Sequence, residues 1–306
     1  MTKFNRREFL RRAGMVGATA CGIGLAGESM LGLLEEAEAA GGSTLAIASG
    51  AAIEIMVTKA VIALGGIGKF VKKGNTVVIK PNFAWARTPD QAATTNPKVM
   101  SALIKLCKQA GASKITIFDH TCDNATEAFD LSGAKQLAAT SKVRLISADK
   151  QFMYRQISIP KGKLLKSDTC ISEVLDADVF INVPIAKVHG GSTITASMKN
   201  LMGVNWDRGA WHRSKDLEQC IADYSTVVKP DLIILDAVRI LLTGGPKGPG
   251  DTKDIGKIAA STDPVAIDAY AATLLGKTPS KVKHIAYAAS LGLGQMDLSK
   301  VTVKKV

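Results

Sequence analysis

The sequence is poor in aromatic residues and lacks long apolar segments, and each shortage excludes a class of protein. Aromatic side chains make up 5% of the 306 residues, and no basic run with interleaved aromatics occurs, so we expect no nucleic acid as a partner. No uncharged apolar run reaches the roughly 18 residues that a membrane helix needs, so we expect no transmembrane span in the mature chain. Periodic repeats and low-complexity tracts are absent, which excludes collagen, a coiled coil and wholesale disorder.

Cysteines are few and scattered, and two common catalytic motifs are missing. The five cysteines include no C-x-x-C pair, so the sequence shows no local zinc or iron–sulfur ligand set; we expect mostly buried thiols, with one or two disulfides left open. No G-x-S-x-G motif of a serine hydrolase occurs, and the glycine-rich segment 242–250 lacks the G-K-[ST] ending of a P-loop. That segment is interpreted as a domain-crossing loop or an anion-binding nest.

The first 39 residues predict an export signal rather than part of the fold. Residues 5–11 (NRREFLR) resemble the twin-arginine motif of bacterial export signals, a small-residue apolar stretch follows, and residues 37–39 (AEA) form a candidate cleavage site, with lipidation at Cys21 as the alternative. We therefore expect the twin-arginine export machinery as a partner and a periplasmic or otherwise extracytoplasmic location. The mature domain is then residues 40–306.

The chain is strongly basic. Its formal net charge is +12, and residues 1–39 hold five basic and five acidic side chains, so the mature part keeps the whole excess. A solvated basic surface is the plain explanation. Attraction of a small anionic ligand is the more specific one.

Apolar β-branched runs alternate with helical patterns along the mature chain. Strands are predicted at 76–79, 114–118, 143–146, 178–183 and 232–236, and helices at 96–111, 125–140, 172–175 and 264–275. This alternation predicts an α/β fold with a mostly parallel sheet and helices on both faces, and it leaves open whether the domain divides into two lobes.

Polar side chains that directly follow strands are the candidate site residues, because ligands of open α/β sheets bind at the carboxyl ends of the strands. Three clusters and one single residue meet that condition: Lys80 with Asn82; Asp119 with His120, Asp123 and Asn124; Lys187 with His189, followed by Lys199, Asn200 and Gly203; and Asp236. We expect Lys80, Asn82, Asp119 and Asp236 to meet in one cleft. Turn chemistry and helix caps are the structural alternatives for Lys80, Asn82, Asp119 and Asn124.

The histidines and lysines suggest proton transfer on a small anion. Histidine moves protons near neutral pH, and lysine holds an oxyanion or a carboxylate. We therefore assign His189, His120 and Lys187 as catalytic candidates. Lys199, Asn200, Gly203, Lys80 and Asn82 are candidates for binding a cofactor or anion, while His189, His212 and Asp119 are metal candidates. His284 lies in an ordinary helical pattern and is expected at the surface.

Several of these segments resemble the domain-of-unknown-function 362 family. The resemblance covers about residues 44–306 and is carried by 78–82 (VIKPN), 95–97 (TNP), 187–189 (KVH), 199–203 (KNLMG), 236, 245–246 (GP), 250, 261–268 (STDPVAID) and 292–294 (GLG). Many members are described as iron–sulfur proteins because they carry a segment with clustered cysteines. This chain lacks that segment.

A more remote similarity is to the nickel-dependent lactate racemase family. There, a proton-relay histidine stands about ten residues before the lysine that tethers a nickel-pincer nucleotide, as His189 stands before Lys199. His120 matches the second relay histidine, whereas the nickel-binding histidine has no clear match: His212 is near, and Lys215 occupies the expected region. The similarity implies a nickel-pincer nucleotide as cofactor.

Together these features predict an exported enzyme that acts on a small carboxylate-bearing molecule by His/Lys proton transfer, in the manner of a racemase or epimerase. The alternative is a cofactor-binding or iron–sulfur-associated accessory protein that serves a redox partner and has no catalysis of its own.

Overall fold

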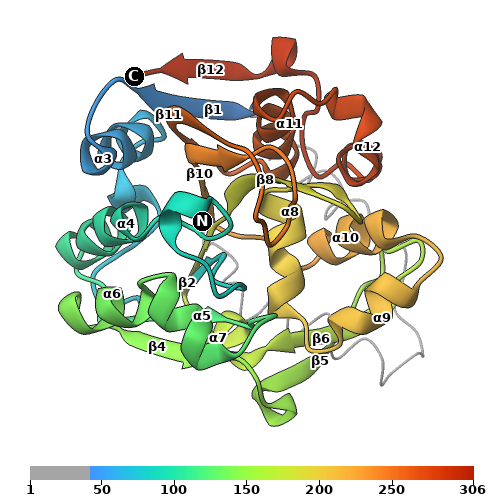
Figure 1. Cartoon of the computed structure of the whole chain (residues 1–306), viewed down its shortest axis with the longest axis horizontal. Coiled ribbons are helices and arrows are strands. Elements are labelled where there is room, and N and C mark those ends of the chain that lie inside the picture. The colour runs from blue at the N-terminus through green and yellow to red at the C-terminus, as the bar shows by residue number, and fades with distance from the viewer. Residues whose placement is uncertain (1–41) are drawn as a thin grey trace, which may run out of the picture.

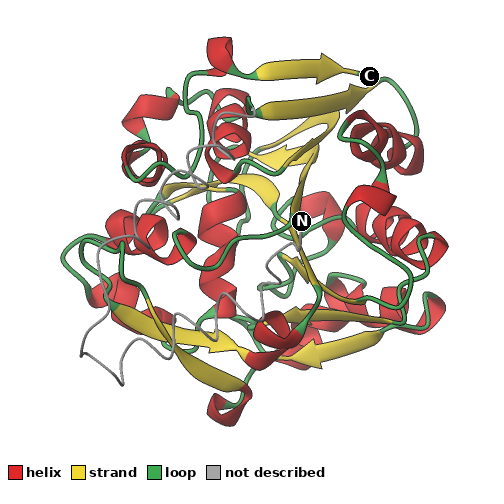
Figure 2. Ribbon diagram, turned by 180° about the vertical axis from the view of Figure 1, so that it is seen from behind, coloured by secondary structure: helices red, strands yellow, loops and turns green. Residues whose placement is uncertain are grey.

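A sheet of ten strands runs through the domain, with helices on both of its faces (Figures 1 and 2). The structure is a computed structural model that describes residues 42–306. The predicted export segment, residues 1–39, lies outside the described residues, so the twin-arginine signal and the periplasmic location stay predictions. The sheet is mixed and mostly parallel, which confirms the predicted α/β class.

The main sheet has the order β12-β1-β11-β10-β7-β2-β3-β4, with β8 paired to β10 and β9 paired to β8. Its strands are β1 (Thr44–Ser49), β2 (Thr76–Pro81), β3 (Lys114–Asp119), β4 (Arg144–Ser147), β7 (Val179–Val183), β8 (Ile185–His189), β9 (Thr193–Thr195), β10 (Leu232–Leu241), β11 (Thr252–Ser261) and β12 (Thr302–Lys305). Strands β5 (Tyr154–Ser158) and β6 (Ser167–Ile171) form a separate antiparallel ribbon. The pairs from β10 through β4 are all parallel, so the carboxyl ends of these strands meet at one edge.

The helices differ in length and in how they begin. They are α3 (Ile53–Ala63), α4 (Pro97–Gln109), α5 (Ala125–Leu131), α6 (Ala134–Thr140), α7 (Ser172–Asp176), α8 (Ser197–Asn200), α9 (Arg208–Arg213), α10 (Leu217–Ser225), α11 (Pro264–Leu274) and α12 (Lys283–Ser290). Helix α4 starts as the sequence predicts: the Asn96 side chain accepts from Lys98 N, and Pro97 takes the first helical position. Among the described helices, none is long and apolar enough to cross a membrane.

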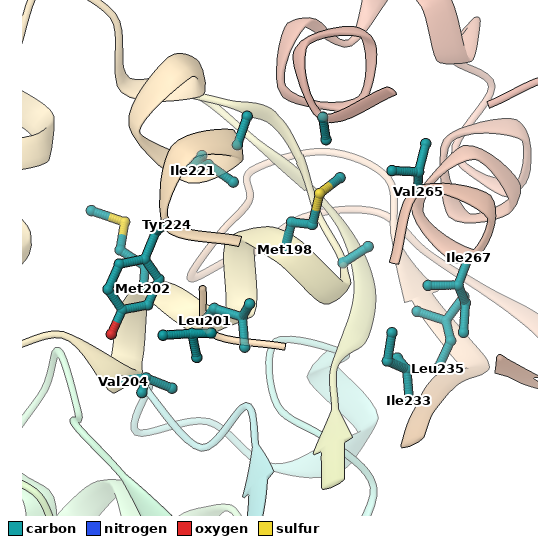
Figure 3. Close-up of a cluster of buried hydrophobic side chains, with 14 of the residues drawn as sticks. Met198, Leu201, Met202, Val204, Ile221, Tyr224, Ile233, Leu235, Val265 and Ile267 are labelled. Carbon is teal, nitrogen blue, oxygen red and sulfur yellow. The ribbon is translucent and has the colours of Figure 1, made fainter. Parts of the chain in front are cut away.

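Side-chain alternation along the central strands builds two cores, one on each face of the sheet. In β7, Phe180 belongs to one core, while Val179 and Ile181 belong to the other. The first core includes Met198 and Leu201, which lie close to α10 in Figure 3. Helix α8, although only four residues long, is thereby held in place by buried apolar contacts.

Three sequence predictions need correction. The helix predicted over 125–140 is two helices, because Gly133 takes a φ of +77° between α5 and α6. The strand predicted to end at 236 continues to Leu241, because β11 pairs with it from Ile233 to Leu241, with one register shift between Ala237 and Arg239. The segment 242–250 is the hairpin loop between antiparallel β10 and β11, and so does not cross between domains.

Candidate active site

One cavity, with a volume of about 440 Å³, brings together the predicted site residues. It lies where β2, β3 and β8 end, and α8 and α9 contribute to its wall. The predicted catalytic, binding and metal candidates all line it: His189, His120, Lys187, Lys199, Asn200, Gly203, Lys80, Asn82, His212 and Asp119. Its volume is within the ~300–1,000 Å³ range of small-molecule sites.

A buried ion pair forms the floor of the cavity. Lys80 Nζ lies 2.7 Å from Asp119 Oδ1, and both side chains are almost completely buried. Asp119 Oδ2 accepts a hydrogen bond from the backbone N–H of Phe83 at 2.6 Å. Gly203 lies against this pair, because a Cβ there would be 2.7 Å from Lys80 Cε and 2.9 Å from Asp119 Oδ1. The close approach explains glycine at 203.

The two asparagines of the site are satisfied by the protein itself. Asn82 Nδ2 donates to Asn200 Oδ1 at 3.0 Å, and Asn200 Nδ2 donates to Asn182 Oδ1 at 2.8 Å. Asn82 Oδ1 in turn accepts from Lys187 Nζ at 3.2 Å. These amides therefore fix the end of β2 against α8 and orient Lys187.

Lys187 and Lys199 are buried amines without a carboxylate partner among the described residues. Lys187 Nζ donates to Asn82 and to the carbonyl of Ala93 at 2.5 Å, and Lys199 Nζ has only the Met202 sulfur at 3.2 Å. Burial, reinforced by neighbouring cations, lowers the pKa of Lys187 to about 7 and that of Lys199 to about 8. Both amines thus titrate near neutral pH.

His189 presents one ring nitrogen to the protein and leaves the other for a ligand. Its Nδ1 accepts hydrogen bonds from the backbone N–H groups of Gly191 at 2.9 Å and Ser192 at 3.2 Å. The proton of the neutral ring therefore resides on Nε2. Burial and the nearby charges of Lys199 and Lys187 lower the pKa of His189 to about 2, so the ring is neutral.

His120 has the opposite tautomer. Its Nδ1 lies 3.2 Å from the carbonyl oxygen of Asn205, which only accepts, so Nδ1 carries the proton and Nε2 carries the lone pair. The ring stacks on Trp206, with centroids 5.3 Å apart and planes 6° from parallel. Burial, followed by the charge of Arg208, lowers the pKa of His120, which keeps the ring neutral. The two histidines therefore offer one acceptor and one donor.

Several cavity residues were not predicted from the sequence, among them Arg208, Cys122 and Thr195. Arg208 donates to the carbonyl oxygens of His120 at 2.6 Å and Thr121 at 2.9 Å, which holds the turn after β3. Thr195 Oγ1 is buried and has no hydrogen-bond partner among the described residues. Arg208 is in a helix, so a search for polar residues directly after strands passes over it. Cys122 lies between the selected residues His120 and Asp123 and is passed over because the cysteines are expected to be mostly buried thiols.

Other predicted residues do not line this cavity. Asp236 lies inside the extended β10, where its carboxylate accepts from the backbone N–H groups of Asn96 and Val238. Asp123 pairs with Lys247 at 2.8 Å, and Asn124 caps α5.

His284 is completely buried, contrary to the surface position expected. Its Nδ1 lies 3.2 Å from Glu218 and its Nε2 lies 3.7 Å from Asp268. Two carboxylates from α10 and α11 thus make an interior position favourable for this ring.

The cofactors implied by the resemblances place different demands on the site. Within residues 42–306, no group of three or more His, Cys, Asp or Glu side chains is arranged to hold a metal ion, and three of the four cysteines there are buried. The described residues therefore do not fit an iron–sulfur cluster or a metal held by protein ligands alone. A tethered organic group needs only a reactive lysine, and Lys199 has the required amine with a lowered pKa.

Comparisons with known proteins identify the family. The model described as "Domain of unknown function (DUF362)" matches residues 77–273, and the chain belongs to this family. The thylakoid-associated protein sll1697 of Synechocystis sp. is 28% identical over 238 residues, which cover 75% of this chain and 72% of that protein.

A solved structure of low similarity is the lactate racemase apoprotein from Thermoanaerobacterium thermosaccharolyticum. The TM-score is 0.49 with 14% sequence identity, over 74% of this chain and 56% of that chain. The match thus spans little more than half of that protein, and similarity at this level does not transfer function.

Proposed function

We propose that the chain is an acid–base enzyme that binds a small carboxylate-bearing molecule in the cavity and moves a proton on it, as racemases and epimerases do. The observation that carries the proposal is that one cavity holds two buried amines without a carboxylate partner and two histidines of opposite tautomer. The buried amines would bind the carboxylate of the ligand, and the histidines would provide one proton acceptor and one proton donor.

Charge supports an anionic ligand. The described lining contains the cations Lys80, Lys187, Lys199 and Arg208 but a single carboxylate, Asp119, which Lys80 already pairs. A buried charge without a partner is unfavourable, and a bound carboxylate would supply the missing partner.

The histidine tautomers support distinct roles. His120 Nε2 has the free lone pair that a general base needs, and a pKa below the ordinary value keeps it available at neutral pH. His189 Nε2 carries a proton and suits donation to a ligand oxygen rather than proton removal. Lys187, with a pKa of about 7, is the group able to return a proton near neutral pH.

Solvent-isotope exchange tests the proposal. The folded protein is incubated in deuterium oxide with lactate and other small 2-hydroxycarboxylates, and deuterium at the carbon beside the carboxylate is followed by NMR. We expect His120→Ala to slow exchange by ~10²–10⁴-fold and added imidazole to restore part of it. Wild-type exchange in His120→Ala on an active substrate would refute the assigned base.

The accessory-protein alternative predicts a different result. A protein that binds carboxylates but exchanges no proton, in wild type and variants alike, is a binding module. Intact mass of protein taken directly from cells shows whether Lys199 carries a covalent group, and metal analysis of the same sample shows whether nickel accompanies it.

A further inference from the structure

Cys122 is the one exposed cysteine of the described chain, and it faces the cavity. Cys107, Cys170 and Cys220 are buried. The backbone N–H of Cys122 donates to the carbonyl of Ala84 at 2.7 Å, which fixes the residue in the turn after β3. A reagent that enters the cavity therefore meets this thiol before any other.

A guanidinium lies at hydrogen-bond distance from the Cys122 sulfur. Arg208 Nη1 donates a hydrogen bond to Cys122 Sγ at 3.2 Å, and the same guanidinium is held by two backbone carbonyls. A negative charge on Cys122 also interacts favourably with Lys187 and Lys199. The thiolate is the species that attacks a disulfide, and Arg208 is placed to pair with it.

Two further groups in the same cavity lack partners that a ligand would supply. Lys199 is nine-tenths buried, and its ammonium has no oxygen acceptor among the described residues. The buried hydroxyl of Thr195 likewise makes no hydrogen bond there. Carboxylate oxygens would satisfy both, so the arms of an attacking reagent that fits beside Cys122 should carry carboxylates.

We propose that Cys122 is a modification site that forms a mixed disulfide with a small carboxylate-bearing disulfide. The Cys122 thiolate attacks one sulfur of the reagent, the new Sγ–S bond forms as the reagent's S–S bond breaks, and the departing thiolate takes up the proton that Cys122 released. The adduct would lie in the cavity and exclude other ligands. The inference shares the cationic lining with the proposed function but does not depend on proton transfer.

The test compares disulfides of different charge. Folded protein is treated with oxidised glutathione (anionic), hydroxyethyl disulfide (neutral) or cystamine (cationic), and adducts are located by peptide mass mapping. We expect one adduct per chain, at Cys122, and an anionic-to-cationic rate ratio at least ~10-fold above that of a free-cysteine peptide. Dithiothreitol should reverse the adduct.

Variants separate the local charges from the general basicity of the chain. Cys122→Ser should abolish the adduct, and Lys199→Met should lower the rate ratio, whereas Lys305→Met, at an exposed strand, should leave it unchanged. A rate ratio equal to that of the peptide, an adduct at another cysteine, or reaction only after unfolding would each overturn the proposal. None of these readouts requires an enzymatic substrate, so failure here is distinct from failure of the proposed function.

Discussion

Binding of a carboxylate should draw a proton into the cavity. The pKa of Lys187 is lowered to about 7 and that of Lys199 to about 8, chiefly by burial. At pH 8 these amines are therefore ~10% and ~50% protonated, respectively. An opposite charge within ~4–6 Å raises such a pKa by ~1–3 units, which would protonate both almost fully. Binding at pH 8 should take up ~1.4 protons per ligand.

Calorimetry measures this uptake directly. Lactate is titrated into the protein at pH 8 in two amine buffers of different ionisation enthalpy, and the difference in observed heat gives the number of protons. The affinity should fall ~25-fold or more between pH 8 and pH 9, since binding then requires protonation of the amines. Lys187→Met should reduce the uptake to ~0.5 proton, because Lys199 alone remains to titrate.

The matched control is Lys305→Met, which removes a lysine that is exposed on β12. It should bind lactate with wild-type proton uptake. Equal heats in the two buffers, together with measurable lactate binding, would refute the reasoning, because the amines would then be charged before the ligand arrives.

Two further predictions concern the support of the cavity. Gly203→Ala should lower the free energy of unfolding in urea by ~1–3 kcal/mol, because the added Cβ would lie too close to the Lys80–Asp119 pair. The control is Gly190→Ala, which should have little effect because no atom lies within 4 Å of the added Cβ. Equal losses of stability in the two variants would contradict the close-approach argument. Burial alone lowers the pKa of His284, but Asp268 and Glu218 outweigh it, and the net pKa is raised. The resulting stabilisation is complete below the unfolded-state pKa of ~6.5 and is lost as pH rises through the folded-state pKa, so His284→Gln should flatten the urea stability profile above pH 6.5; an unchanged profile would show that the ring does not titrate.

Sequence patterns located the site where it depends on strand ends and missed what depends on tertiary packing. Lys80 and Asp119 could be predicted because parallel strands bring their carboxyl ends to one edge, whereas His189 lies at the end of β8, a strand that the sequence patterns did not predict. Asp236 follows the same local pattern, but its strand continues beyond it because β10 pairs with β11. Nothing in the local sequence indicates that pairing, so the sequence wrongly places Asp236 at a strand end.

The residues that sequence reasoning missed or misplaced depend on contacts between distant segments. Arg208 reaches the turn at 120–122 across 86 or more positions, and His284 is buried by carboxylates from two other helices. A helical pattern in the sequence does not indicate that His284 will contact buried carboxylates. It also does not indicate that Arg208 will hydrogen-bond to the turn at 120–122.

The electrostatics of the cavity favour a ligand-bound state over an empty one. Four basic side chains around a single carboxylate leave more positive charge than the described protein neutralises there, and burial lowers the pKa of the three lysines among them. Buried unpaired charge is tolerated in folded proteins chiefly where it serves binding or catalysis, because apolar replacements would be more stable. The short helix α8 carries Lys199 on a base of buried apolar contacts and backbone bonds to Asp268, so the amine cannot easily withdraw to solvent. An anion that enters the cavity would therefore stabilise the charged form of Lys199.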